Sequence, residues 1–70
     1  MTERERIGAR IAELRKLKGL TQEQLAEKAG FTRSNVYNVE AGRYSVGIDI
    51  LAKLAEALDA SVEIIKKTNV

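Results

Sequence analysis

At 70 residues the chain has room for one small domain, which we place at residues 1–70. It contains no Cys and no His, so disulfides, thiolate metal sites and the usual near-neutral general base are excluded, and we expect no metal, no cofactor and no enzymatic activity. The net charge is +2 and no apolar run approaches the ~20 residues that cross a bilayer, so we expect a cytoplasmic protein that enters no membrane.

Charge is polarised along the chain. Residues 1–20 hold six Lys or Arg against three Glu, whereas residues 48–61 hold one Lys against three acids. Solvated helix faces explain most single charges, and the net charge alone is a weak argument for a nucleic-acid partner.

The first predicted helix begins at Thr2. Glu5 follows at the spacing of a capping box, in which each side chain accepts a hydrogen bond from the other residue's backbone amide. Apolar residues then recur at helical spacing to form one buried stripe: Ile7, Ile11 and Leu14. Gly8 lies inside the helix and would permit a close approach by another helix, and Gly19 is a natural left-handed stop.

The second predicted helix begins at Thr21, which has Gln24 at capping-box spacing, and it ends at Gly30. Its inner face consists of small and apolar side chains: Leu25, Ala26 and Ala29. A helix of about two turns is too short to be stable alone, so it must pack against its neighbours.

The third predicted helix spans residues 33–41, with Thr32 as its N-cap and Gly42 as its stop. Val36 and Val39 form its inner face. Two helices joined by a tight turn that contains Gly form a helix-turn-helix, which we place at residues 21–42.

The outer face of the third helix is unusual for a solvated helix. Its side chains are short hydrogen-bonding groups with one guanidinium and one phenol, and its only acid, Glu40, lies beside the inner face. Arg can bind guanine through two hydrogen bonds, Asn can bind adenine in the same way, and Ser suits either base. Singly, Ser34 and Asn35 are ordinary first-turn residues and Tyr37 could pack against a neighbouring loop. Together these side chains indicate DNA contact.

The fourth predicted helix is capped by Gly47 or Ser45 and carries one apolar stripe: Ile48, Leu51, Leu54, Ala55 and Leu58. Ile50 lies off this stripe, either as additional core or as part of a partner surface.

The tail, residues 61–67, alternates Val62 and Ile64 with Glu63 and favours a short strand over a further helical turn. A second copy of that strand would satisfy its hydrogen bonds in a two-stranded ribbon.

The segment LTQEQLAEKAG at residues 20–30, followed by the Val36…Val39-Glu40-Ala41-Gly42 spacing, resembles the Cro/Xre family of phage-repressor-like helix-turn-helix proteins. The resemblance extends from Ile7 through Leu58. It implies an all-α fold, a compact lambda-repressor-like bundle of four to five short helices with a central helix-turn-helix. Family members often end in a fifth, dimerising helix, whereas the tail here looks more like the subset with a C-terminal dimerising strand.

The resemblance also implies residue roles. Arg33, Ser34 and Asn38 match base-contacting positions of the family, and we expect base contact from Tyr37 on the same outer face. The family often has Glu or Gln where Tyr37 stands, which leaves the contribution of that residue open. Gln22, Asn35 and Arg43 match phosphate-contacting positions of the family, and we expect the same contact from Thr32 and Tyr44. Arg15 and Glu40 match an ion pair that joins the first helix to the end of the third.

We therefore expect a sequence-specific transcriptional regulator that binds double-stranded DNA, acting as a homodimeric repressor on a palindromic operator. The dimer interface is expected to use three exposed apolar residues: Ile50, Val62 and Ile64. The alternative is an antitoxin or adaptor of the same fold, whose main role is to bind a partner protein such as a toxin.

Overall fold

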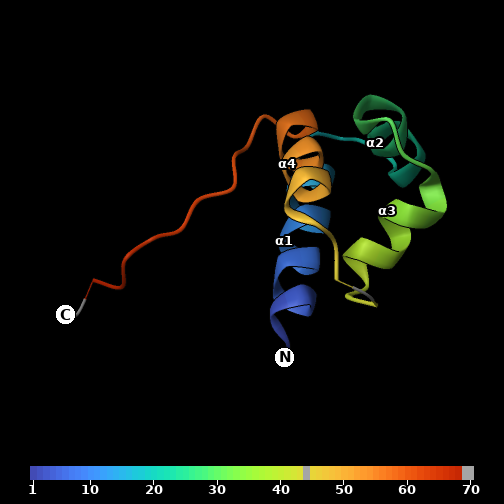
Figure 1. Cartoon of the computed structure of the whole chain (residues 1–70). Helices are drawn as coiled ribbons and strands as arrows, with labels where there is room; N and C mark the ends of the chain where they lie inside the picture. Colours follow the sequence, from blue (N-terminus) through green and yellow to red (C-terminus); the bar gives the residue numbers. More distant parts are fainter. Residues whose placement is uncertain (44, 69–70) are drawn as a thin grey trace.

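The computed structural model describes residues 1–43 and 45–68. In this part of the chain there are four α-helices and no strand (Figure 1). The helices are α1 (Glu3–Leu17), α2 (Gln22–Ala29), α3 (Arg33–Glu40) and α4 (Ile48–Ala57). The predicted all-α fold with a central helix-turn-helix is confirmed.

The predicted caps set the helix starts. In α1, the Thr2 amide donates to Glu5 Oε1 at 2.7 Å and the Glu5 amide donates to Thr2 Oγ1 at 3.2 Å. Thr21 and Gln24 form the same box at α2, with distances of 2.8 and 3.0 Å. Thr32 caps α3 by accepting from the amide of Asn35 at 3.2 Å. These local bonds satisfy amides that a helix start leaves without partners.

The core is made of the inner faces that the sequence indicates. Its buried side chains come from all four helices and the end of α4: Ile11, Leu25, Ala26, Val36, Val39, Leu54 and Leu58. α2 packs against both α3 and α4, and α1 packs against α3. The two short helices of the motif therefore depend on α1 and α4 for their positions.

Gly8 marks the closest approach of α1 to α3. A Cβ added to Gly8 would lie 2.2 Å from the Val39 carbonyl oxygen and 2.8 Å from that of Glu40. Both atoms belong to the backbone of α3 and cannot move aside as a side-chain tip could. The expected close approach is confirmed, and its partner is the C-terminal end of α3.

The ends of α4 complete the domain. The N-cap is Gly47 and not Ser45. Because glycine has no side chain, the start of α4 has no side-chain cap bond. After α4 the chain turns through Asp59, a non-glycine residue in the left-handed region at φ 56°. The Asp59 carboxylate pairs with Lys18 at the end of α1, and this hydrogen bond lowers the pKa of Asp59.

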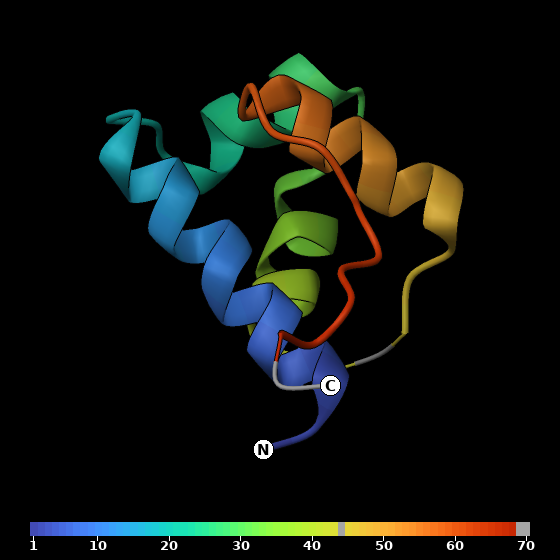
Figure 2. The same ribbon diagram turned by 90° about the vertical axis from the view of Figure 1, so that its left-hand side faces the viewer.

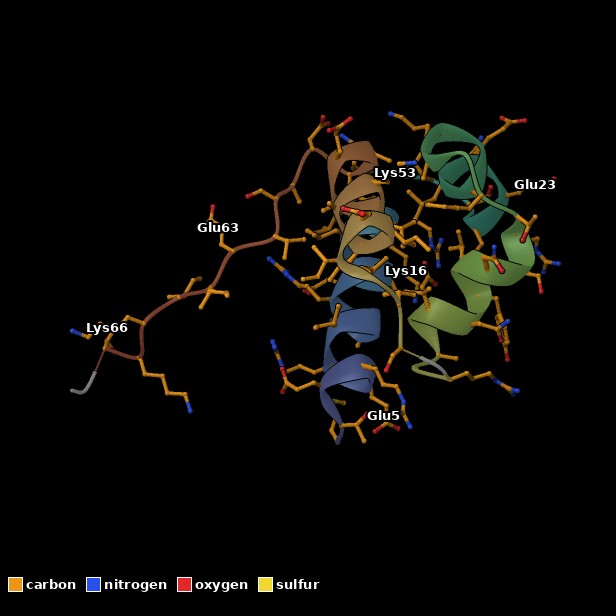
Figure 3. All side chains as sticks on the ribbon, viewed as in Figure 1. Glu5, Lys16, Glu23, Lys53, Glu63 and Lys66 are labelled. Carbon is orange, nitrogen blue, oxygen red and sulfur yellow. The ribbon has the colours of Figure 1, made fainter. Side chains whose placement is uncertain are left out.

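The tail extends away from the body of the protein in Figure 1, and in Figure 2, viewed from that side, it crosses in front of the helices. Glu63 and Lys66 lie along this extended segment, away from the helices (Figure 3). Residues 61–68 form neither a helix nor a strand, so the favoured strand is absent from the single chain. Ile64 is fully exposed, and Ile65 is 77% exposed. A strand needs a neighbour to accept its hydrogen bonds, and none of the described segments supplies one.

Among the described residues, no helix combines the length and the apolarity that crossing a lipid bilayer requires.

Gly8→Ala should destabilise the fold. In a free helix this change would stabilise by about 1 kcal/mol, but here the new methyl group meets the backbone of α3, and such overpacking costs about 1–3 kcal/mol. Urea unfolding followed by circular dichroism would measure the loss. Gly47→Ser is the control, because nothing lies within 4 Å of that position and its stability should change by only a few tenths of a kcal/mol. Equal stability of the Gly8 variant and the wild type would contradict the close packing.

Candidate nucleic-acid interface

α3 presents one polar face to solvent. Val36 and Val39 are buried beneath it, whereas Arg33, Ser34 and Tyr37 are exposed and Asn38 is half-buried. α3 lies on the opposite side of the body from the tail (Figure 1), and nitrogen- and oxygen-tipped side chains extend from its outer side (Figure 3). The structure thus brings the four expected base-contacting residues onto one helix, available to a partner.

Glu40 is the only acid of α3, and it lies inside. Its side chain is 7% exposed and that of its partner Arg15 is 11% exposed. Arg15 Nε donates to Glu40 Oε2 at 2.7 Å and Arg15 Nη2 donates to Glu40 Oε1 at 3.1 Å. The predicted ion pair is confirmed, and the two-pronged hydrogen bond raises the pKa of Arg15. The outer face of α3 therefore carries no carboxylate that would repel phosphate.

Two further bonds extend this pair into a network. Arg15 Nη1 donates to the Leu20 carbonyl at 2.8 Å, which fixes the turn before α2. Gln22 Nε2 donates to Glu40 Oε1 at 3.0 Å. One carboxylate thus ties α1, the start of α2 and the end of α3 together, and no buried side-chain polar atom among the described residues lacks a partner.

The bond from Gln22 was not foreseen from the sequence. Gln22 was expected to contact phosphate, but one hydrogen of its amide is directed to Glu40, and its second amide hydrogen is left for a phosphate. No local signal indicates this bond, because Gln22 and Glu40 are 18 residues apart. The phosphate role of Gln22 stays a prediction.

The other expected phosphate contacts lie around the edges of α3. Thr32 and Asn35 are exposed at its start, where the helix dipole favours an anion. Arg43 is exposed just after its end. Tyr44 lies outside the described residues.

The loop after α3 brings two of the predicted residues together. The guanidinium carbon of Arg43 lies 5.7 Å from the centroid of the Tyr37 ring, within range of a cation–π contact. Arg4 Nε in α1 donates to the Gly42 carbonyl at 3.0 Å and holds this loop. The idea that Tyr37 packs against a neighbouring loop is therefore confirmed, and its specific partner was not foreseen.

The three residues expected at a dimer interface do not form one patch. Ile50 is 40% exposed on α4 and borders a cavity of about 40 Å³ together with Phe31 and Val36. Val62 borders a groove between α1 and α4, and Ile64 is fully exposed on the tail. In a dimer whose interface contains Val62 and Ile64, Ile50 would lie outside that interface.

The described residues contain no group of three or more acidic, His or Cys side chains that could hold a metal ion.

The chain is similar in sequence and in fold to known proteins. The helix-turn-helix family model HTH_3 matches residues 11–65. An uncharacterized HTH-type transcriptional regulator of Sinorhizobium fredii, y4dJ, is 37% identical over 70 residues, which cover 99% of this chain and 91% of that protein.

Solved structures agree with the sequence comparison. The restriction-modification controller protein C.AhdI from Aeromonas hydrophila has a TM-score of 0.81 and 44% identity, covering 84% of this chain and 86% of that chain. The master regulator for biofilm formation SinR, solved in complex with DNA, has a TM-score of 0.74 and 39% identity, covering 79% of this chain and 89% of that chain. A relative from Bacillus subtilis carries the name SinR as well.

Glu40→Ala should act through stability. It leaves the guanidinium of Arg15 buried without its carboxylate, and breaking a buried pair in this way costs about 3 kcal/mol or more. Thermal unfolding would measure the loss. Glu27→Ala, an exposed acid on α2, is the control and should change stability by less than about 0.5 kcal/mol. An unchanged melting temperature together with lost DNA binding would contradict the structural role of Glu40.

Proposed function

This chain belongs to the helix-turn-helix family HTH_3, and from that premise we propose that it is a transcriptional regulator that binds double-stranded DNA sequence-specifically. In this proposal it acts as a dimeric repressor of a palindromic operator. The observation that carries the proposal is the outer face of α3. That face carries exposed hydrogen-bonding side chains, and the one acid of α3, Glu40, is turned inward. A protein that occupies an operator prevents other proteins from binding there, which is the simplest form of repression.

Base contact follows from the chemistry of three side chains. α3 lies in the major groove, which is wide enough to admit a helix. Arg33 at its start donates to the two acceptors of a guanine, and Asn38 pairs with an adenine. Ser34, one residue after Arg33, donates to or accepts from either kind of base.

Phosphate contacts fix the position of α3 and carry no sequence information themselves. We assign them to residues around the ends of the motif: Gln22, Thr32, Asn35, Arg43 and Tyr44. Support comes from the exposure of Thr32, Asn35 and Arg43, and for Thr32 and Asn35 also from the start of α3, where they lie. Arg43 supplies a full positive charge, so it accounts for part of the dependence of affinity on salt.

A second copy of the chain completes the site. Two α3 helices would enter successive major grooves about 34 Å apart, one turn of DNA. We place the contact between copies at the tail, where Val62, Ile64 and Ile65 are exposed on a segment that forms no strand with the rest of the described chain. Pairing of two tails as an antiparallel ribbon would satisfy those backbone groups and cover the apolar side chains.

The exposed apolar tail also favours a second candidate function. An antitoxin or adaptor of the same fold would use the tail and Ile50 to bind a partner protein such as a toxin. DNA binding by the isolated protein distinguishes the two, because a regulator binds its operator without a partner and an obligate adaptor does not.

Arg33→Ala tests the base contact. On a duplex selected by the wild-type protein from random sequences, the variant should lose roughly 1–3 kcal/mol of binding free energy and should relax the preference at one base position. Fluorescence anisotropy with labelled duplexes measures both affinities. An equal loss on a scrambled duplex would show that Arg33 contacts phosphate instead.

Lys28→Ala is the matched control for Arg33, since it also removes one positive charge. Lys28 lies in the last turn of α2, and its charge lowers the pKa of Asp59 slightly, after the main effect of the hydrogen bond from Lys18. It is exposed and lies outside the expected DNA contacts, so its removal should change affinity by less than about twofold, through long-range charge alone.

Arg43→Ala tests the phosphate contact. It should weaken binding to selected and scrambled duplexes alike and reduce the slope of log affinity against log salt by about one, because one fewer counterion is released. Titrations at several salt concentrations measure the slope. A slope equal to that of the wild type would count against this role.

A further inference from the structure

We propose that Tyr37 is a positioning residue whose ring holds the Arg43 guanidinium in place for DNA, and that Tyr37 itself contacts no base. The inference rests on the proposed DNA binding, and it replaces the base-contacting role that the sequence assigned to Tyr37. It begins from the 5.7 Å contact between the Arg43 guanidinium and the Tyr37 ring. Arg and an aromatic face at this separation attract each other.

The backbone on which Arg43 stands is fixed by the end of α3. The Gly42 amide donates to the Val39 carbonyl at 3.1 Å, and the Arg43 amide donates to the Asn38 carbonyl at 3.0 Å. Gly42 has φ +69°, so these two bonds complete a Schellman motif. In this motif the second residue beyond the helix cap commonly packs on a side chain of the last turn. Here Arg43 is the second residue beyond the cap and Tyr37 is the residue in the last turn. The usual apolar contact between these positions is replaced by a cation–π contact.

The backbone is also clamped to α1 at Gly42, directly before Arg43. Arg4 Nε holds the Gly42 carbonyl at 3.0 Å, and a Cβ on Gly42 would lie 2.6 Å from Glu5 Cγ. A long Arg side chain loses much rotamer freedom when it binds a phosphate, and a guanidinium already held loses less. The Tyr37 ring supplies that restraint.

The contact also limits what Tyr37 can do at a base. Tyr37 is 46% exposed, and the guanidinium lies over one face of its ring. A base that stacked on that face would have to displace Arg43. Sequence discrimination by α3 is therefore left to Arg33, Ser34 and Asn38, and Tyr37 contributes affinity for every sequence.

A double-mutant cycle on DNA tests the coupling. Tyr37→Leu should weaken binding to the selected and the scrambled duplex by the same factor, roughly two- to fivefold, which corresponds to an exposed cation–π contact. Tyr37→Phe keeps the ring and should bind both duplexes as the wild type does. In an Arg43→Ala background, Tyr37→Leu should cause no further loss. Additive losses, or a changed base preference in either Tyr37 variant, would overturn the proposal.

A measurement on the free protein separates this proposal from the proposed function. In the nuclear magnetic resonance spectrum, the Tyr37 ring should shift the side-chain protons of Arg43, and Tyr37→Leu should abolish the shift whereas Tyr37→Phe should keep it. Absence of the shift in a protein that binds DNA would overturn the positioning role alone. A protein that keeps the shift but binds neither duplex would overturn the proposed function, and the DNA role of the contact with it.

Discussion

The buried carboxylate of Glu40 is the point on which the rest of the structure depends. It accepts two bonds from Arg15 and one from Gln22, and so it joins three segments that are far apart in the chain. α2 and α3 have only eight residues each, too few to keep their own geometry in water. The network and the contact at Gly8 hold the end of α3 against α1, and the core valines hold its middle. The orientation of the outer face is set by these contacts.

The chemistry of that face follows from the same arrangement. Because Glu40 is turned inward and neutralised by Arg15, α3 can end in an acid without presenting it to a phosphate. Because the Gly42 carbonyl is held by Arg4, the backbone directly before Arg43 is tied to α1. Val36 and Val39 provide the packing of α3 against the core. The outer side chains of α3 are therefore not needed for packing and are available for hydrogen bonds to a partner.

Local patterns predict most of the fold. The capping boxes at Thr2 and Thr21, the valine spacing in α3 and the glycine stops are short-range signals, and each appears where expected. The contacts of Gln22 with Glu40 and of Arg43 with Tyr37 depend on how helices and loops meet, which no local pattern encodes. The Arg15–Glu40 pair was predicted only through the family resemblance. The tail alternates like a strand, but a strand needs a partner that the single chain does not provide.

Selection of bound sites from random DNA by the purified protein tests the central claim most directly, because it asks whether α3 reads sequence and whether two copies do so together. The expected result is an enriched palindrome whose half-sites are centred about 10–10.5 base pairs apart, with a guanine and an adenine among its specified positions. Enrichment of no sequence, or of a single half-site without symmetry, would contradict a dimer that reads its operator through two α3 helices.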